Sequence, residues 1–399
     1  MFARGRVYRI MYLTNLKAVI GYCSNGVVQF LSGSVLRSEE LERQIDSWKT
    51  TSALKQMPLN FQVSVNENNS RSSADDSKEL FTFGYNYDSV PQNPLKLTSN
   101  DEEHKRLLSD ILDRAGIRDL NTSFLSSDSN HPSSSSLLSS NDIRWLHWLK
   151  NDVLWGDTDI LMLPDTNFIR RHYWSRRFKR MLSPTGELYH LFQPKGLNIH
   201  FKISRLTAFE LGNQIDRAKQ KERGLKKNKK PDEGATKEKR EAERQVRLSI
   251  HDNYELLRLL KDGAELLPEL SPQSAQDFSK TSDAQTRDKM IRKEIRDYFS
   301  GIGAGERYLF LTCDEGSFLA ASSEGMPTLF FSYSSKERQV LHYPHEPTDL
   351  LIESAMYFGA IGVWKVLGGV HSEIFLFEGY WEGKLPEDWM NDCVRMSRL

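Results

Sequence analysis

The chain has few cysteines and no excess of charge of either sign. Its 399 residues include three cysteines, and 54 Lys and Arg balance 54 Asp and Glu, which gives a formal net charge of zero. Cys23, Cys313 and Cys393 are far apart and odd in number, which argues against a disulfide framework and a cysteine zinc site. Because the net charge is zero, affinity for a polyanion must come from local clusters of basic residues.

The sequence also lacks long apolar runs and phosphate-binding loops. No stretch reaches the roughly 20 apolar residues that a membrane span requires, and residues 1–7 do not open a signal peptide. No glycine-rich loop follows a strand pattern, and no Gly-x-Ser-x-Gly motif occurs. His342 and His345 are the closest histidine pair, and Pro344 between them favours a loop over a helix. We therefore expect a cytoplasmic protein with no membrane partner.

The first part of the chain predicts a small α+β module over residues 1–120. Two β-branched runs, 17–23 and 27–31, flank the turn sequence Ser24-Asn25-Gly26, which is typical of a hairpin. Alternating and amphipathic patterns predict further elements in this module. These are strands at 61–65 and 80–85 and helices at 39–48 and 103–115.

A serine-rich segment, 121–140, has little to bury and predicts a flexible linker. From 141 to 399, strand and helix patterns alternate, which predicts an α/β fold with a doubly wound, mostly parallel sheet. We assign residues 214–248 to a basic insertion in this domain and 332–399 to its C-terminal extension. The expected elements are strands ending at 165 and at 197–203, 308–311, 328–331 and 362–367, and helices after 141, at 167–181, around 210, and at 250–260 and 288–299.

Four acids in this second part are candidates for one metal site. Asp165 and Asp314 stand at the carboxyl ends of apolar, strand-like runs, where open α/β sheets place their ligands. Glu210 lies in a helical pattern, and Asp288 opens another. Carboxylates brought together by a fold repel one another, so such a cluster indicates a hard divalent cation such as Mg²⁺ or Mn²⁺.

Each acid also has a simpler interpretation. Asp165 would cap a helix through its side chain. Glu210 would be a solvated helical acid, which is the commoner fate of a glutamate. Asp288 competes with Asp283 for the third position, and either would favour a helix N-terminus electrostatically.

Taken in order, the four segments resemble the PIN-domain family of metal-dependent nucleases. Asp165-Thr166-Asn167 is similar to the family's opening motif, and Thr312-Cys313-Asp314 to its last core strand, with Cys313 where Asn is frequent. The resemblance covers about 159–331, and the long gap between Glu210 and Asp288 departs from compact members.

The resemblance implies an endoribonuclease that hydrolyses RNA phosphodiester bonds. In it, Asp165, Glu210, Asp288 and Asp314 would bind Mg²⁺ or Mn²⁺ and carry the catalysis. Asn167 and Thr312 would orient these carboxylates.

Two basic clusters are candidates for contact with nucleic acid. Arg170 and Arg171 follow Asp165 among aromatic residues that would either stack on bases or form the buried stripe of a helix. We favour the buried stripe for Trp174 and Phe178. The second cluster, in the basic insertion, would either bind phosphates or be a solvated arm. It contains Lys226, Lys227, Lys229 and Lys230.

Two other functions stay open. In the first, the domain is a catalytically inactive PIN-like scaffold that binds nucleic acid or protein. In the second, it is a structure-selective DNA nuclease, since no motif in the sequence reads a base or a sugar and so distinguishes RNA from DNA. The N-terminal module is a candidate for recognising a substrate or a protein partner. The sequence leaves the oligomeric state undecided.

Overall fold

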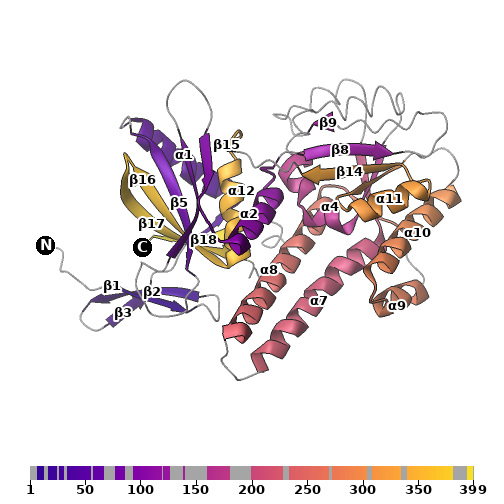
Figure 1. Ribbon diagram of the computed structural model, residues 1–399, viewed down its shortest axis with the longest axis horizontal. Coiled ribbons are helices and arrows are strands. Elements are labelled where there is room, and N and C mark those ends of the chain that lie inside the picture. Colours follow the sequence, from indigo (N-terminus) through magenta and orange to yellow (C-terminus); the bar gives the residue numbers. More distant parts are fainter. Residues whose placement is uncertain are drawn as a thin grey trace. The chain divides into compact units, whose positions relative to one another are not determined.

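The computed structural model of the chain (Figure 1) divides into two compact units. Unit 1 comprises residues 1–117 and 338–399, and unit 2 comprises 118–337. The structure describes residues 7–12, 17–24, 27–30, 34–54, 57–66, 77–85, 93–118, 120–125, 138–139, 160–179, 199–227, 233–268, 272–302, 308–333, 339–380 and 393–398. The expected helix carrying Trp145 and Trp148 lies outside these ranges.

The described strands of unit 1 form an eight-stranded antiparallel sheet and a separate three-stranded one. The larger sheet has the order β15-β7-β6-β5-β16-β17-β18-β4. Its strands are β4 (Ser34–Arg37), β5 (Leu59–Asn66), β6 (Ser77–Tyr85), β7 (Asn93–Leu97), β15 (Val340–Leu341), β16 (Ala360–Leu367), β17 (Val370–Tyr380) and β18 (Cys393–Arg398). The smaller sheet contains β1 (Val7–Tyr12), β2 (Lys17–Ser24) and β3 (Val27–Phe30). Since β2 and β3 pair antiparallel, the expected hairpin is confirmed.

Alternation of side chains gives the larger sheet one apolar face. Phe61 and Val63 on β5 are fully buried, and Phe61 stacks on Phe83 of β6 with ring centroids 4.9 Å apart. Helices α1 (Ser38–Leu54), α2 (Glu102–Arg114) and α12 (Glu346–Phe358) complete the unit. The expected strands and helices of the N-terminal module are therefore present.

The C-terminal segment belongs to unit 1 and does not extend the second domain as the sequence led us to expect. Strand β16 lies between β5 and β17, in the middle of the antiparallel sheet. The alternating pattern at 362–367 predicts a strand but does not specify its partner, because pairing depends on residues about 300 positions earlier in the chain.

Unit 2 is built on a sheet with the order β12-β11-β10-β13-β14-β8-β9. The first five are parallel, and β8 joins β14 antiparallel. The bounds are β8 (Leu120–Leu125), β9 (Leu138–Ser139), β10 (Ile160–Pro164), β11 (Ile199–Ile203), β12 (Glu265–Leu266), β13 (Tyr308–Thr312) and β14 (Thr328–Tyr333). The α/β class is confirmed for this unit, while β8 and β9 fall where we expected a linker.

Helices α7 and α8 pack side by side as a long hairpin (Figure 1). The helices of unit 2 are α4 (Thr166–Arg170), the π-helix η3 (Trp174–Phe178), α7 (Arg205–Lys227), α8 (Glu233–Lys261), α9 (Pro272–Lys280), α10 (Ala284–Ile302) and α11 (Glu315–Ser323). Among the helices of the described ranges, none is both long and apolar enough to cross a bilayer.

The expected helix 167–181 is interrupted at His172. This residue has a φ of 55°, and α4 ends just before it. A positive φ is costly for a residue with a Cβ, so the surrounding contacts must hold His172 in place.

The core beneath the sheet of unit 2 connects β10 and β13 to α10. It contains Leu163, Phe310 and Ile295, all nearly or fully buried. Their packing fixes how α10 lies against the two central strands, and therefore where Asp288 on α10 points.

We predict that Ile295→Ala lowers the free energy of unfolding of unit 2 by about 2–5 kcal/mol, because the truncation leaves a cavity in this core. Urea unfolding combined with hydrogen exchange of the β13 amides measures the loss in unit 2 specifically. Leu319→Ala, whose side chain is 55% exposed, is the control and should cost much less. Equal losses for both variants would contradict the assigned core.

Candidate metal centre

The strand order of unit 2 reverses between β10 and β13. From β10 the parallel sheet continues through β11 and β12 on one side, and through β13 and β14 on the other. At such a reversal the connections leave in opposite directions, which opens a crevice at the carboxyl ends of the two strands. Asp165 directly follows β10 and Asp314 closely follows β13, so both acids lie at this crevice.

Asp165 accepts one hydrogen bond from α4 and one from the end of β13. Its Oδ1 accepts from the main-chain N–H of Phe168 at 2.7 Å, and its Oδ2 accepts from the Thr312 hydroxyl at 2.5 Å. The residue therefore caps α4 and also faces β13, so the two sequence interpretations are compatible. Burial is the main cause that raises the pKa of Asp165 to about 7. The hydrogen bonds from Thr312 and Phe168 oppose this shift, and the charges of Asp288 and Asp314 add to it.

Asp314 is positioned by the same threonine. Its main-chain N–H donates to the Thr312 hydroxyl oxygen at 3.0 Å, and its Oδ1 accepts from the N–H of Ser317 at 2.7 Å. Thr312 is fully buried and contacts both acids, which is the orienting role that the resemblance implied for it. Between them, Cys313 is partly buried.

Glu210 reaches the site from α7. Its Oε2 accepts a hydrogen bond from the Thr166 hydroxyl at 2.6 Å, and its Oε1 lies 3.7 Å from Nη1 of Arg287. The side chain is 10% exposed, so Glu210 is not the solvated helical acid of the simpler interpretation. Thr166, next to Asp165, was not singled out from the sequence because its hydroxyl has no distinguishing pattern.

Asp288 lies in the second turn of α10 and not at its start, where we had placed it. Asp283 precedes α10, is exposed, and accepts hydrogen bonds from the N–H and hydroxyl of Thr286. Burial raises the pKa of Asp288 to about 6, and the charges of Glu210 and Asp314 raise it further. The structure therefore brings Asp288, and not Asp283, into the group of acids.

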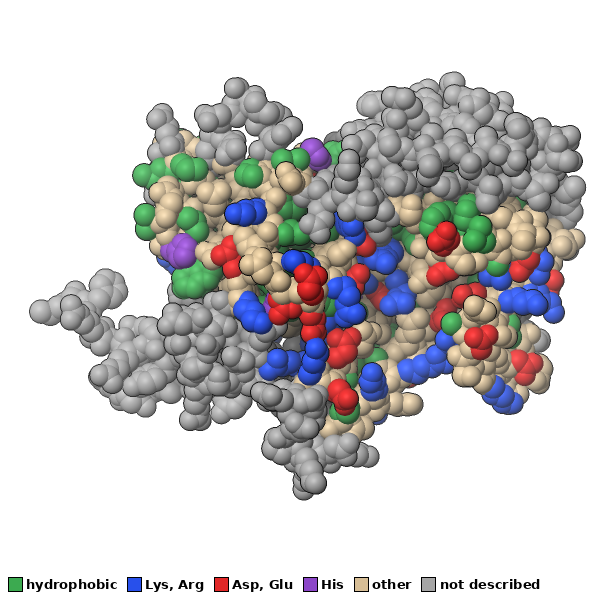
Figure 2. Space-filling view, viewed as in Figure 1, with side chains coloured by type: hydrophobic (Ala, Val, Ile, Leu, Met, Phe, Trp, Pro, Cys, Tyr) green, Lys and Arg blue, Asp and Glu red, His purple; other side chains and the backbone are tan. Residues whose placement is uncertain are grey.

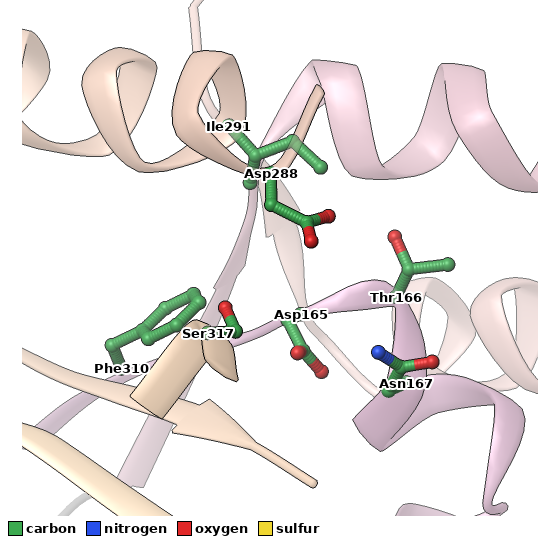
Figure 3. Close-up of a pocket in the computed structure, with 7 residues that line it drawn as sticks. All are labelled: Asp165, Thr166, Asn167, Asp288, Ile291, Phe310 and Ser317. Atoms are coloured by element: carbon green, nitrogen blue, oxygen red, sulfur yellow. The ribbon is translucent and has the colours of Figure 1, made fainter. Parts of the chain in front are cut away.

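Two of these acids, Asp165 and Asp288, line a small cavity. Figure 3 shows Asp288 projecting from α10 toward the end of β10, where Asp165 lies, with Ser317 and Asn167 to either side. The cavity offers about 10 Å³ to the centre of a water-sized sphere, which is room for one water molecule or one ion. Its lining consists of Asp165, Thr166, Asn167, Asp288, Ile291, Phe310 and Ser317.

The donor set fits a hard divalent cation. Carboxylate oxygens are the ligands that Mg²⁺, Mn²⁺ and Ca²⁺ prefer, and here they come from four separate elements. Burial first, and the neighbouring acids second, raise the pKa values of Asp165 and Asp288, so the ionised forms of both are disfavoured without a further positive charge. A bound dication would supply the missing positive charge.

The first basic cluster is partly engaged within unit 2. Arg170 forms an ion pair with Asp252 of α8, with Nε 3.3 Å from Oδ2. Tyr173 is buried, and Trp174 is partly buried and donates its ring N–H to Asp262. Arg171 is partly buried.

Part of the sequence interpretation falls outside the described side chains. For Phe178 only the backbone is described, so the expected burial of its ring lies outside the described residues. The same holds for the side chains of Lys226 and Lys227 and for the whole of Lys229 and Lys230.

Unit 2 holds a second set of metal-ligating side chains. The rings of His172 and His251 are buried, with centroids 4.3 Å apart. Nε2 of His172 lies 3.5 Å from Asp252, and its Nδ1 lies 4.0 Å from Glu255. Imidazole nitrogens suit transition metals, so this pair could hold an ion of a different kind from the carboxylate group. Sequence spacing did not reveal it, because the two histidines come from different elements.

Comparison of the chain with family models, with curated proteins and with solved structures finds no match. The geometry of the acids therefore carries the functional argument by itself.

We predict that the metal-free protein becomes less stable as the pH rises from 5 to 8. The pKa of Asp165, about 7, exceeds its ordinary 3.8, so the folded state holds this proton more tightly than the unfolded state does. The stability that this group contributes is present below about pH 4 and lost as the pH approaches 7. At about 1.4 kcal/mol per pKa unit, the loss is on the order of a few kcal/mol.

Urea unfolding in EDTA at both pH values measures this loss, and Asp165→Asn should reduce it. Asp283→Asn is the control: its pKa is lowered, so its contribution changes only at acidic pH. A wild-type protein as stable at pH 8 as at pH 5 would contradict the assigned environment of Asp165.

Proposed function

We propose that unit 2 is a PIN-like, metal-dependent nuclease domain that hydrolyses RNA phosphodiester bonds with Mg²⁺ or Mn²⁺. One observation carries the proposal: four acids, far apart in the sequence, interact at the reversal of strand order, and two of them, Asp165 and Asp288, line a cavity that has room for an ion. The ordered sequence resemblance to PIN domains agrees with this placement.

In this mechanism, Asp165, Glu210, Asp288 and Asp314 would hold a divalent ion, directly or through water, and Thr312 and Thr166 keep the carboxylates of Asp165 and Glu210 oriented. When bound, a divalent ion lowers the pKa of a coordinated water and offsets negative charge on the phosphate. The attacking water would lose a proton to solvent as its oxygen bonds to phosphorus, the bond from phosphorus to the leaving sugar oxygen would break, and that oxygen would take up a proton from solvent. No side-chain nucleophile takes part.

Helix α7 supports a nucleic-acid substrate. It carries Glu210 near one end and the exposed cations Arg217, Lys221 and Arg223 further along. An α-helix rises 1.5 Å per residue, so Arg217, the first of these cations, lies roughly 10 Å from Glu210 along the helix axis. A short single strand of nucleic acid is long enough to reach both. Figure 2 shows Lys and Arg side chains interspersed with Asp and Glu side chains on this face of the molecule. The cations would hold phosphates that flank the one being cleaved.

We predict that Asp165→Asn combined with Asp314→Asn abolishes carboxylate-dependent Mn²⁺ binding and lowers RNA cleavage by at least about 100-fold, since losing an orienting residue alone costs roughly 10- to 100-fold. Calorimetric Mn²⁺ titration and cleavage of a labelled RNA measure the two effects. Asp283→Asn, which changes an exposed acid directly before α10, is the matched control and should behave as wild type.

Cleavage unchanged in the double variant would contradict the nuclease proposal. Mn²⁺ binding without cleavage of RNA or DNA would instead favour an inactive scaffold. A matched DNA strand cleaved in preference to RNA would assign the domain to DNA.

We predict that replacing Arg217, Lys221 and Arg223 together with Gln weakens binding of single-stranded RNA and flattens its salt dependence. Three lost phosphate contacts should change the slope of log affinity against log salt by about 2. Fluorescence anisotropy between 50 and 300 mM salt, as a rough working range, measures the slope. The control replaces Lys96, Lys105 and Arg106, three exposed cations of unit 1, and an equal change in slope would argue against α7 as the phosphate contact.

A further inference from the structure

Arg287 is a basic residue within the group of acids. It lies on α10, directly before Asp288, and its side chain is 13% exposed. Its Nη1 is 3.7 Å from Oε1 of Glu210, an ion-pair separation that is too long for a hydrogen bond. Arginine has five N–H donors in a rigid plane, so this single contact leaves most of them unused.

The Nε–H of Arg287 has a further distinction. It is buried, and among the described residues it has no hydrogen-bond partner. A buried donor without a partner is destabilising, and such groups point to a ligand or water that completes the site.

The neighbouring arginine is already engaged. Arg292, one turn further along α10, donates to Glu324 from both Nε and Nη2 and approaches Ser317 at 3.5 Å. It therefore fixes α10 against α11, whereas Arg287 faces Glu210 with donors to spare.

We propose that Arg287 binds a non-bridging oxygen of the phosphate that is cleaved, with Glu210 holding the guanidinium in place. This inference rests on the nuclease proposal above. Four carboxylates repel a phosphodiester, and a planar guanidinium next to them provides a directional, permanently charged contact for its oxygens. Arg287 is thus assigned to substrate binding, and the acids to binding metal.

The alternative is that Arg287 only offsets the charge of Glu210. The two roles affect different quantities. If Arg287 contacts the phosphate, it contributes to the affinity for RNA. If it only compensates charge, it stabilises the ionised acids. Removing a cation that merely compensates the acids should change Mn²⁺ affinity and stability without changing the affinity for RNA.

The experiment compares Arg287→Gln and Arg287→Lys with wild type in the full-length protein. Mn²⁺ affinity is measured by calorimetry, and the affinity of the Mn²⁺-loaded protein for a single-stranded RNA by anisotropy. We expect Arg287→Gln to weaken RNA binding about 10- to 100-fold, with Mn²⁺ affinity unchanged or increased. Arg287→Lys should be intermediate, because it keeps the charge but loses the planar fork. Lys289→Gln, an exposed cation two residues along the helix, is the matched control.

RNA affinity that is unchanged in both Arg287 variants, in a protein that binds Mn²⁺ and cleaves RNA, would overturn this inference alone. Loss of RNA affinity in Lys289→Gln to the same extent would also overturn it, because the effect would then be one of general charge. A wild-type protein without carboxylate-dependent Mn²⁺ binding would instead remove the nuclease proposal on which the inference rests.

Discussion

The hydroxyl of Thr312 joins the two halves of the candidate metal centre. It donates to Asp165 after β10 and accepts from the N–H of Asp314 after β13. Because Asp165 and Asp314 carry like charges, the fold must bring them together against their repulsion. The parallel pairing of β10 and β13 supplies that constraint, and the main-chain bond from Asp165 to Leu311 reinforces it. The positions of Glu210 and Asp288 then depend on how α7 and α10 pack against this pair of strands.

Much of unit 2 could be predicted because its signals are local. An apolar run that ends in an acid, as before Asp165 and Asp314, marks both a buried strand and its carboxyl end. Adjacent parallel strands then place those ends at one edge of the sheet, so the two acids were expected together. The helix that carries Asp288 was predicted, but its first turn was not, because α10 begins four residues before Asp288, at Ala284.

What the sequence could not show depends on partners far away in the chain. The strand at β16 was expected, but its place beside β5 follows from packing that no local pattern encodes. Strand β8 was read as part of a linker because the serine-rich segment 121–140 has little to bury, yet pairing with β14 satisfies its backbone. Arg287 was overlooked as one of many charged residues, and only the packing of α10 against α7 reveals its nearness to Glu210.

The division of the chain has a consequence for its biosynthesis. Unit 1 is assembled from segments that precede and follow unit 2 in the sequence, so its strand β16 is synthesised after unit 2. A ribosome therefore releases all of unit 2 before the N-terminal strands receive the neighbour that completes their sheet. Until β16 emerges, the edge of β5 lacks this partner and is open to pairing with other chains, so this interval exposes the protein to aggregation.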